Sequence, residues 1–276
     1  MSCYISEKLV VSKTSKHTSY SCQPKTKDEL KQILKERLSK DKDADLNDID
    51  VSLIEVMSSL FSGLDPHEID ISQWDVSNVR DMKSMFCNCN QFNSNISQWD
   101  VSSVEDMAYM FCGCKKFNSD LSHWDVSSIK DMSFMFANCD SFNSDLSHWD
   151  VSSVEDMPYM FCGCKKFNSD LSHWDVSSIK DMSFMFANCD SFNSDLSHWD
   201  ISNVKTMHGM FGNCKKFNSD LSHWDVSNVE NMNSMFFKCQ SFNSDLSQWD
   251  VANVQDMDSM FYSCSSLRKK PSWYRG

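Results

Sequence analysis

The sequence predicts an α/β repeat solenoid of 25-residue units, each with a strand and a short helix, and with a helical N-terminal cap. Three observations predict this fold. Tryptophan recurs every 25 residues without an insertion, cysteine recurs in step with it, and an amphipathic segment precedes the array. Units that cannot bury their own apolar faces must stack on one another. The two series are Trp74, Trp99, Trp124, Trp149, Trp174, Trp199, Trp224 and Trp249, and Cys89, Cys114, Cys139, Cys164, Cys189, Cys214, Cys239 and Cys264.

The unit register divides the chain into four parts. Residues 1–25 are polar and aperiodic, so we expect a flexible N-terminal arm. Residues 26–70 hold the predicted cap helix and a degenerate repeat, and residues 71–266 hold an eight-unit solenoid. Residues 267–276 contain a basic run and Pro271, which predict a C-terminal cap.

The segment after residue 25 has the pattern of an amphipathic helix. Thr26 and Glu29 have the spacing of a capping box. In the degenerate unit that follows, Ile49 takes the place of the tryptophan. A helix ending near Ser39 would cover the stacking face of this first unit with four apolar residues, Leu30, Ile33, Leu34 and Leu38.

Within each unit, the second half is expected to be helical and the first half extended. Apolar residues of the second half have helical spacing, and Pro158 requires the helix to begin just before it. We expect a helix over about Met107–Cys112, with Asp106 as N-cap and Gly113 in the left-handed conformation after it. A strand is expected over residues 121–126, with a bend or bulge because its two large apolar residues are three positions apart.

Composition excludes several classes of protein. The net charge is -13 and no basic block occurs, which argues against nucleic-acid binding. No apolar run is long enough to span a membrane, and the first residues lack the hydrophobic core of a secretory signal. The polar residues that could do chemistry recur in every unit, whereas a catalytic site needs one asymmetric cluster, so we predict no enzyme and no cofactor.

The thirteen cysteines have three possible roles. We favour free buried thiols that act as small hydrophobic residues. Disulfides between stacked units are geometrically allowed. A metal site at the Cys-x-Cys pairs is the weaker alternative, because no further ligands follow at zinc-site spacing.

Two ladders of aspartate follow the tryptophans and the Asn-Ser pairs. Hydrogen bonds within turns are the favoured explanation, and calcium binding is the alternative. The Ser122-His123-Trp124-Asp125 sequence has the residue types of a catalytic triad. Neighbours on a strand point to opposite faces, so we do not expect these side chains to converge.

Two columns of side chains are the candidate partner-binding residues. An aromatic stripe forms a partner site if it is accessible and part of the core if it is not. Stacked imidazoles should repel on protonation, so stability or binding is expected to change between about pH 7 and 5. The members are Tyr109, Phe134, Tyr159 and Phe184, and His123, His148, His173, His198 and His223. Charged residues that alternate in sign between units are interpreted as pairs that set the stacking register.

The repeated run FNSDLSHWDVSSxxDMxxMF, followed by cysteine, resembles the BspA-like leucine-rich-repeat surface proteins of bacteria over about residues 28–274. This resemblance implies a leucine-rich-repeat-like solenoid, a location at the cell surface or outside the cell, and adhesion to host or matrix proteins. Because no signal peptide is seen, a cytoplasmic location is the alternative.

The sequence therefore predicts a non-enzymatic repeat scaffold that binds another macromolecule, with a host or extracellular-matrix protein as partner. The alternative is a structural spacer, or an antigenically variable repeat protein without a specific ligand.

Overall fold

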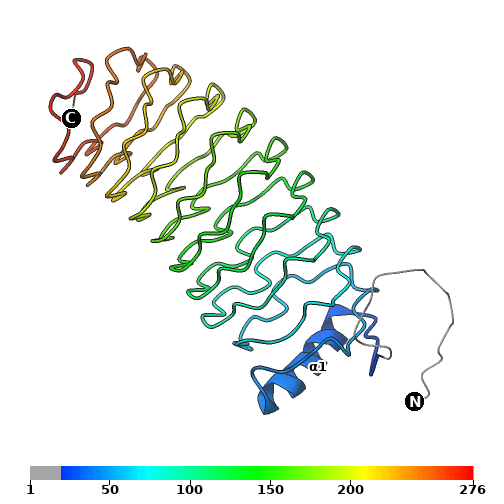
Figure 1. The fold of residues 1–276 in the computed structure, drawn as a ribbon. Coiled ribbons are helices and arrows are strands. Elements are labelled where there is room, and N and C mark those ends of the chain that lie inside the picture. Colours follow the sequence, from blue (N-terminus) through cyan, green and yellow to red (C-terminus); the bar gives the residue numbers. More distant parts are fainter. Residues whose placement is uncertain (1–19, 276) are drawn as a thin grey trace.

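The structure, a computed structural model, describes residues 20–275 and shows an elongated stack of coils (Figure 1). Helix α1, Lys27–Lys40, lies at one end of the stack and the C-terminal residues lie at the other. Successive coils are joined by single parallel bridges between residues 25 positions apart, such as Asp106 with Asp131. The predicted 25-residue periodicity is confirmed.

The predicted strand and helix within each unit are wrong, and with them the α/β, leucine-rich-repeat-like fold class. Within residues 20–275, α1 is the only helix, and the coils meet at isolated bridges rather than in a sheet. The segments Met107–Cys112 and 121–126 consist of turns and irregular backbone. Each coil is therefore a series of turns held in place by its neighbours.

The helical spacing of the apolar residues has another physical origin. Trp124 N donates to Leu121 O at 3.1 Å, Ile129 N to Val126 O at 3.0 Å, and Met135 N to Met132 O at 3.2 Å. In each of these turns the first and fourth residues are buried and the two between them are more exposed. Consecutive turns of this kind produce apolar residues three positions apart, as a helix does. The separation of Leu121 from Trp124 thus reflects a turn and not a bulge.

Alternation of hydrogen bonds excludes a helix in the second half of the coil. Met110 N donates back to Met107 O at 3.1 Å, whereas Tyr109 N and Phe111 N donate to the next coil, each at 2.9 Å. Tyr109 has φ 60 and Gly113 has φ 78, so the chain enters the left-handed region twice within this segment. The left-handed conformation predicted at Gly113 is confirmed, but it belongs to a turn and not to a helix end.

Side-chain hydrogen bonds between coils reinforce the backbone contacts. The Trp124 indole N–H donates to Ile96 O at 3.1 Å, and the Cys114 thiol donates to Phe86 O at 3.0 Å. Asn118 Oδ1 accepts from Asn143 N at 2.7 Å, although the asparagines are exposed. Every coil thus satisfies polar groups of its neighbour, which fixes the register of the stack.

Aromatic rings fill the interior in columns. Trp174 and Trp199 lie 6.5 Å apart with their planes 1° from parallel, and both are 4% exposed. Phe111 stacks on Phe117 of its own coil at 4.0 Å and on Phe136 of the next coil at 5.6 Å. Because each ring packs on copies of itself, the core continues without interruption along the stack.

Helix α1 covers the first coil, as its apolar pattern predicts. Leu30, Leu34 and Leu38 are at most 1% exposed. Thr26 Oγ1 accepts from Glu29 N at 3.2 Å, and the Glu29 carboxylate accepts from Lys25 N rather than from Thr26 N. The helix therefore begins with a modified capping box.

Residues at both ends of the described chain are also tied to the stack. Cys22 forms a parallel bridge with Ile49, so residues next to α1 pair with the degenerate unit. Residues 1–19 of the predicted arm lie outside the described residues. At the other end, Trp273 stacks on Trp249 with ring centroids 6.1 Å apart.

Candidate functional site

One segment of the coil differs strongly from coil to coil, while other segments recur almost unchanged. We call it the variable face and define it as residues 108–113 and their equivalents 83–88, 133–138, 158–163, 183–188, 208–213, 233–238 and 258–263. A central Met-Phe pair is fixed in this face, and the other positions differ. By contrast, the Phe-Asn-Ser-Asp-Leu-Ser segment at 117–122 recurs unchanged five more times. A surface that discriminates between partners needs such local differences on a constant scaffold.

The predicted aromatic stripe lies on the variable face and forms a continuous column. Tyr109 and Phe134 have ring centroids 4.5 Å apart, Phe134 and Tyr159 are 4.4 Å apart, and Tyr159 and Phe184 are 4.7 Å apart. All four residues are half-buried and have φ between 56 and 60. The column is thus partly accessible, which leaves both a packing role and a binding role open to it.

Stacking of the rings determines which parts of them a partner can contact. Both faces of Phe134 and Tyr159 are covered by neighbouring rings, so their edges are the accessible parts. Burial raises the pKa of Tyr159, and its protonated hydroxyl can donate a hydrogen bond. A base or a sugar ring needs a free aromatic face to stack on. The column therefore suits an apolar protein surface with hydrogen-bond acceptors.

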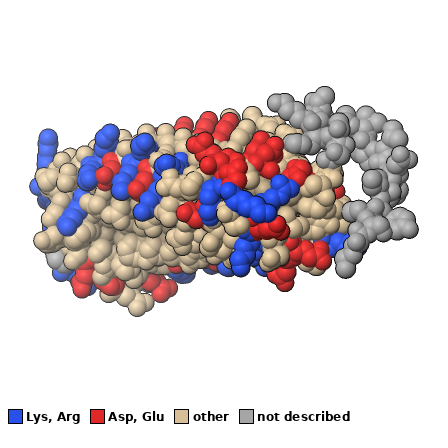
Figure 2. Space-filling view, turned by 90° about the horizontal axis from the view of Figure 1, so that it is seen from below, with Lys and Arg blue, Asp and Glu red and all other residues tan. Residues whose placement is uncertain are grey.

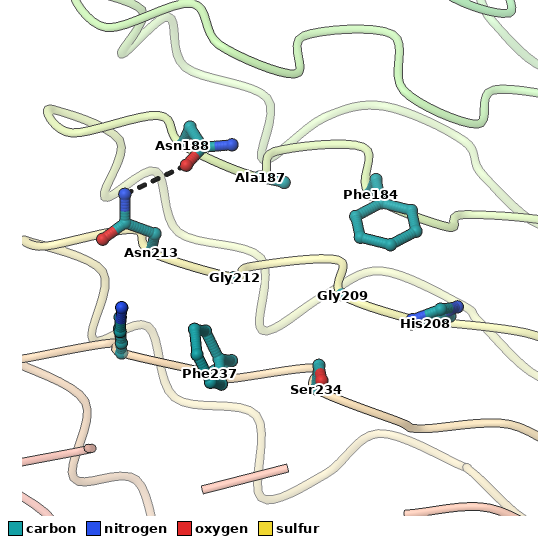
Figure 3. A pocket seen from close by; sticks show the side chains of 10 residues that line it. Phe184, Ala187, Asn188, His208, Gly209, Gly212, Asn213, Ser234 and Phe237 are labelled. Carbon is teal, nitrogen blue, oxygen red and sulfur yellow. Dashed lines mark hydrogen bonds between the residues drawn. The ribbon is translucent and has the colours of Figure 1, made fainter. Parts of the chain in front are cut away.

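The column ends at a notch of about 340 Å³, shown in Figure 3. Gly209 stands where the aromatic residues stand in earlier coils, and Gly212 replaces the alanine or cysteine next along the coil. A Cβ at Gly209 would lie 2.4 Å from the Phe184 ring, so the ring occupies the space of the missing side chain. The notch is lined by Phe184, Ala187, Asn188, His208, Gly209, Gly212, Asn213, Ser234, Phe237 and Lys238.

The notch has aromatic walls and a polar rim. His208 is tilted 50° against Phe184 at a centroid distance of 4.5 Å. Asn213 Nδ2 donates to Asn188 Oδ1 at 3.0 Å (Figure 3). Lys238 Nζ lies 5.0 Å from the centroid of the Phe237 ring, a cation–π distance. This geometry accepts one apolar side chain with an acceptor group beside it.

Sequence reasoning missed this notch. Its signal is that two of the six glycines of the chain lie three positions apart in one coil. Their effect depends on the ring of the preceding coil, which no local pattern reveals.

The five predicted histidines form a second column in the constant part of the coil, and all five are exposed. His198 and His223 line a shallow, polar groove of about 690 Å³ with Asp195 and Asp220. The aromatic and histidine columns thus lie in different segments of the coil. The expected change in stability or binding between about pH 7 and 5 stays a prediction.

The serine and the aspartate near each histidine form hydrogen bonds within turns. Ser122 N donates to Asp120 Oδ1 at 2.9 Å, and Ser127 Oγ donates to Asp125 Oδ1 at 2.6 Å. The favoured explanation of the aspartate ladders, turn hydrogen bonds, is confirmed. Hydrogen bonds from Ser122, followed by the nearby His123, lower the pKa of Asp120.

Charged residues of neighbouring coils pair as the alternation of sign predicts. Figure 2 shows Lys and Arg beside Asp and Glu along one face of the stack. Lys180 Nζ lies 2.8 Å from Glu155 Oε2, and Lys215 Nζ lies 2.8 Å from Asp190 Oδ2. These exposed pairs favour the correct register but contribute little energy each.

The cysteines of residues 20–275 are free thiols. Burial raises the pKa of Cys89 to about 12 and raises that of Cys114 well above its ordinary value. Among the described residues, no group of three or more His, Cys, Asp or Glu side chains is placed to hold a metal ion. No helix in the described part of the chain is long and apolar enough to cross a membrane.

Comparisons with known proteins give a family and one distant structural likeness. A chain of the structure described as "Crystal structure of TLR13-ssRNA13 complex" is 11% identical, with a TM-score of 0.29. The match covers 88% of this chain and 48% of that one, so this chain spans about half its length. A likeness at this TM-score carries no inference about fold or ligand. No curated protein matches.

The family match covers most of the sequence in three overlapping segments. The model of one family, described as "Mycoplasma protein of unknown function, DUF285", matches residues 29–138, 116–220 and 194–274. Since the matched segments run from the cap helix to the last coil, the chain belongs to this DUF285 family.

Proposed function

We propose that this protein is a non-catalytic binding scaffold that uses its variable face to hold another protein. The observation that carries the proposal is the half-exposed column from Tyr109 to Phe184 and the notch that ends it at Gly209. Aromatic anchors beside a pocket are the usual centre of a protein interface.

The resemblance to BspA-like surface proteins supports a host or extracellular-matrix protein as the partner and a location at the cell surface. The net charge of -13 favours a partner with a basic surface over a nucleic acid.

Binding to immobilised fibronectin, laminin and collagen tests the proposal. The test variant carries serine at Tyr109, Phe134, Tyr159 and Phe184. Serine is the native residue of this column at positive φ in other coils, at Ser84, Ser234 and Ser259, so the backbone accepts it. The control variant carries glutamine at the five histidines, because glutamine is native there at Gln73, Gln98 and Gln248.

Wild-type protein and the glutamine variant should bind at least one matrix protein, and the serine variant should bind it at least about tenfold more weakly. Circular dichroism must show that the serine variant is folded. Loss of binding in the glutamine variant alone would assign the site to the histidine column instead. If wild-type protein binds none of the three, the adhesion proposal fails.

The second candidate, a structural spacer, has one observation in its favour. Residues 100–149 and 150–199 are identical except for Ala108 and Pro158. Duplication of two whole coils adds length without adding a new surface. Fractionation of native cells would separate the candidates further, because adhesion requires the protein at the cell surface.

A further inference from the structure

Two thiols meet on the variable face, at Cys87 and Cys112. The two residues occupy the same position of adjacent coils and are half-buried. Asn88 N donates to Cys112 O at 2.7 Å, so a backbone hydrogen bond joins the two coils beside the thiols. The two thiols also lie close enough to shift each other's pKa. No other two cysteines are adjacent in this column, because Ala137 and Ala187 flank Cys162.

The pair is chemically asymmetric. The interaction between the two thiols acts to lower the pKa of Cys87 and to raise that of Cys112. Asn88 Nδ2 also donates to Cys87 Sγ, at 3.4 Å. Burial raises the pKa of both thiols, and that of Cys112 reaches about 12. Cys87 is therefore the better nucleophile and Cys112 the resolving thiol.

The spacing between coils suits a disulfide. The two coils are hydrogen-bonded beside the pair, from Asn88 N to Cys112 O, and hydrogen-bonded neighbouring strands lie about 4.8 Å apart. This falls inside the range of about 4.4–6.8 Å that a disulfide requires between Cα atoms. The deeper cysteines differ, because the Cys114 thiol donates to Phe86 O at 3.0 Å and is fully buried.

We propose that Cys87 and Cys112 form a dithiol site that reacts with a low-molecular-weight disulfide, such as oxidised glutathione, and closes a disulfide between two coils. The Cys87 thiolate attacks one sulfur of the small disulfide, whose S–S bond breaks, and a first small thiol leaves. The Cys112 thiolate then attacks the Cys87 sulfur and expels the second small thiol. Two protein thiols are oxidised, one small disulfide is reduced, and the two protons of the protein thiols end on the two released thiols.

The chain contains its own control for this reaction. The sequence Phe-Cys-Gly-Cys-Lys-Lys-Phe occurs at both 111–117 and 161–167. Cys112 and Cys162 thus have the same local sequence, but only Cys112 faces a second thiol. Alanine is native at this position in Ala137 and Ala187, so Cys87→Ala, Cys112→Ala and Cys162→Ala preserve the packing of the column.

Mass spectrometry after treatment with oxidised glutathione and rapid alkylation tests the proposal. Trypsin leaves both cysteines in one peptide, and a second protease that cuts after Glu105 separates them unless they are bridged. Wild-type protein and Cys162→Ala should give the bridged peptides with Cys87 joined to Cys112. Cys112→Ala should accumulate glutathione on Cys87, and Cys87→Ala should react at Cys112 at least about tenfold more slowly.

A melting scan gives a second measurement. The bridge constrains the unfolded chain, so the oxidised wild-type protein should melt several degrees higher than the reduced protein, and a reductant should reverse the shift. Wild-type protein that carries only glutathione adducts, or that joins Cys89 to Cys114 instead, would overturn the assignment. Equal loss of the bridge in Cys162→Ala would do the same.

Discussion

At the scale of single residues, each tryptophan both fills the core and satisfies a carbonyl of the preceding coil. Trp174 donates from Nε1 to Leu146 O at 3.0 Å, in a site where the residue is 4% exposed. Ile49 shows that the fold accepts an aliphatic residue at this position next to the cap, where it is 1% exposed. In the middle of the stack, replacement leaves a buried acceptor without a partner.

Trp174→Phe should therefore destabilise the protein by about 1–3 kcal/mol, because the ring is largely kept and the Leu146 carbonyl loses its donor. Trp174→Ala adds a cavity and should cost about 3–5 kcal/mol. Equilibrium denaturation in urea, followed by tryptophan fluorescence and circular dichroism, measures both. Equal losses for the two variants would show that the hydrogen bond contributes nothing.

Aspartates of the turns make stability depend on pH. Backbone and side-chain hydrogen bonds from Ser197, and then burial and the nearby His198, act on Asp195, and the net effect lowers its pKa. The pKa is lowered in the same direction at five equivalent residues, namely Asp120, Asp145, Asp170, Asp220 and Asp245. A lowered pKa in the folded state stabilises the protein above the unfolded pKa of about 3.9, and this contribution is lost as pH falls through the folded value.

Asp195→Asn should keep the turn and weaken the pH dependence. Asn95 already accepts from Ser97 N at 3.1 Å at the equivalent position, so an amide can replace the carboxylate. Melting temperatures measured from pH 6 to about pH 3 should fall less steeply in this variant than in wild type. Asp195→Ala should lower the melting temperature at every pH, and identical slopes for wild type and Asp195→Asn would contradict the argument.

At the scale of the coil, the acceptor to which each backbone N–H donates decides whether proline can replace the residue. Ala108 N donates only to the side chain of Asp106, at 2.8 Å, and Pro158 shows that the equivalent position accepts proline. Tyr109 N donates to Ser133 O of the next coil at 2.9 Å, and Tyr109 has φ 60. Residues 108 and 109 are neighbours, but only the first is expected to tolerate proline.

Ala108→Pro should be nearly neutral, whereas Tyr109→Pro should cost about 3 kcal/mol or more. Proline fixes φ near −65° and removes the amide hydrogen, so at Tyr109 it breaks both the turn and a bond between coils. Thermal melts of the two variants, with Tyr109→Ser as a control for loss of the ring, check the prediction. Equal tolerance would mean that this segment is not built from alternating turns.

The proline also removes a hydrogen-bond donor from one carboxylate. Pro158 has no amide hydrogen, so Asp156 lacks the donor that Ala108 N supplies to Asp106. Partial burial, followed by the nearby carboxylates of Asp131 and Asp181, raises the pKa of Asp156.

At the scale of the whole molecule, stability is a sum over coils and the contacts between them. Because residues 100–149 and 150–199 differ at one position, deletion of 150–199 recreates native contacts at the junction of Trp149 with Asp200. This shortened protein should fold and unfold cooperatively, with about a quarter less stability, since two of the full units are gone.

A matched control removes residues 150–162, which is not a whole number of coils. This deletion places polar residues at buried positions and should abolish cooperative unfolding. Circular dichroism and thermal melts compare the two variants. A collapse of the in-register variant would show that the coils depend on more than their neighbours.

The sequence alone determined the period of the fold and the residues inside it. The tryptophan and cysteine series gave the 25-residue coil, and Leu30, Leu34 and Leu38 gave the face of α1. It also located the aromatic column and the pairing of charges between coils. The buried positions follow from the tendency of apolar side chains to avoid water, and the order of apolar residues in the sequence shows that pattern directly.

Only the tertiary structure decided the form of the backbone and the site. Apolar residues three positions apart fit both a helix and a series of turns. The chain forms turns here because amides such as Tyr109 N donate to the next coil, in this case to Ser133 O, and not to a carbonyl of the same coil. The notch at Gly209 likewise depends on the Phe184 ring, and the dithiol depends on Cys87 meeting Cys112. In each case the deciding partner lies about one coil away along the chain, beyond the reach of a local pattern.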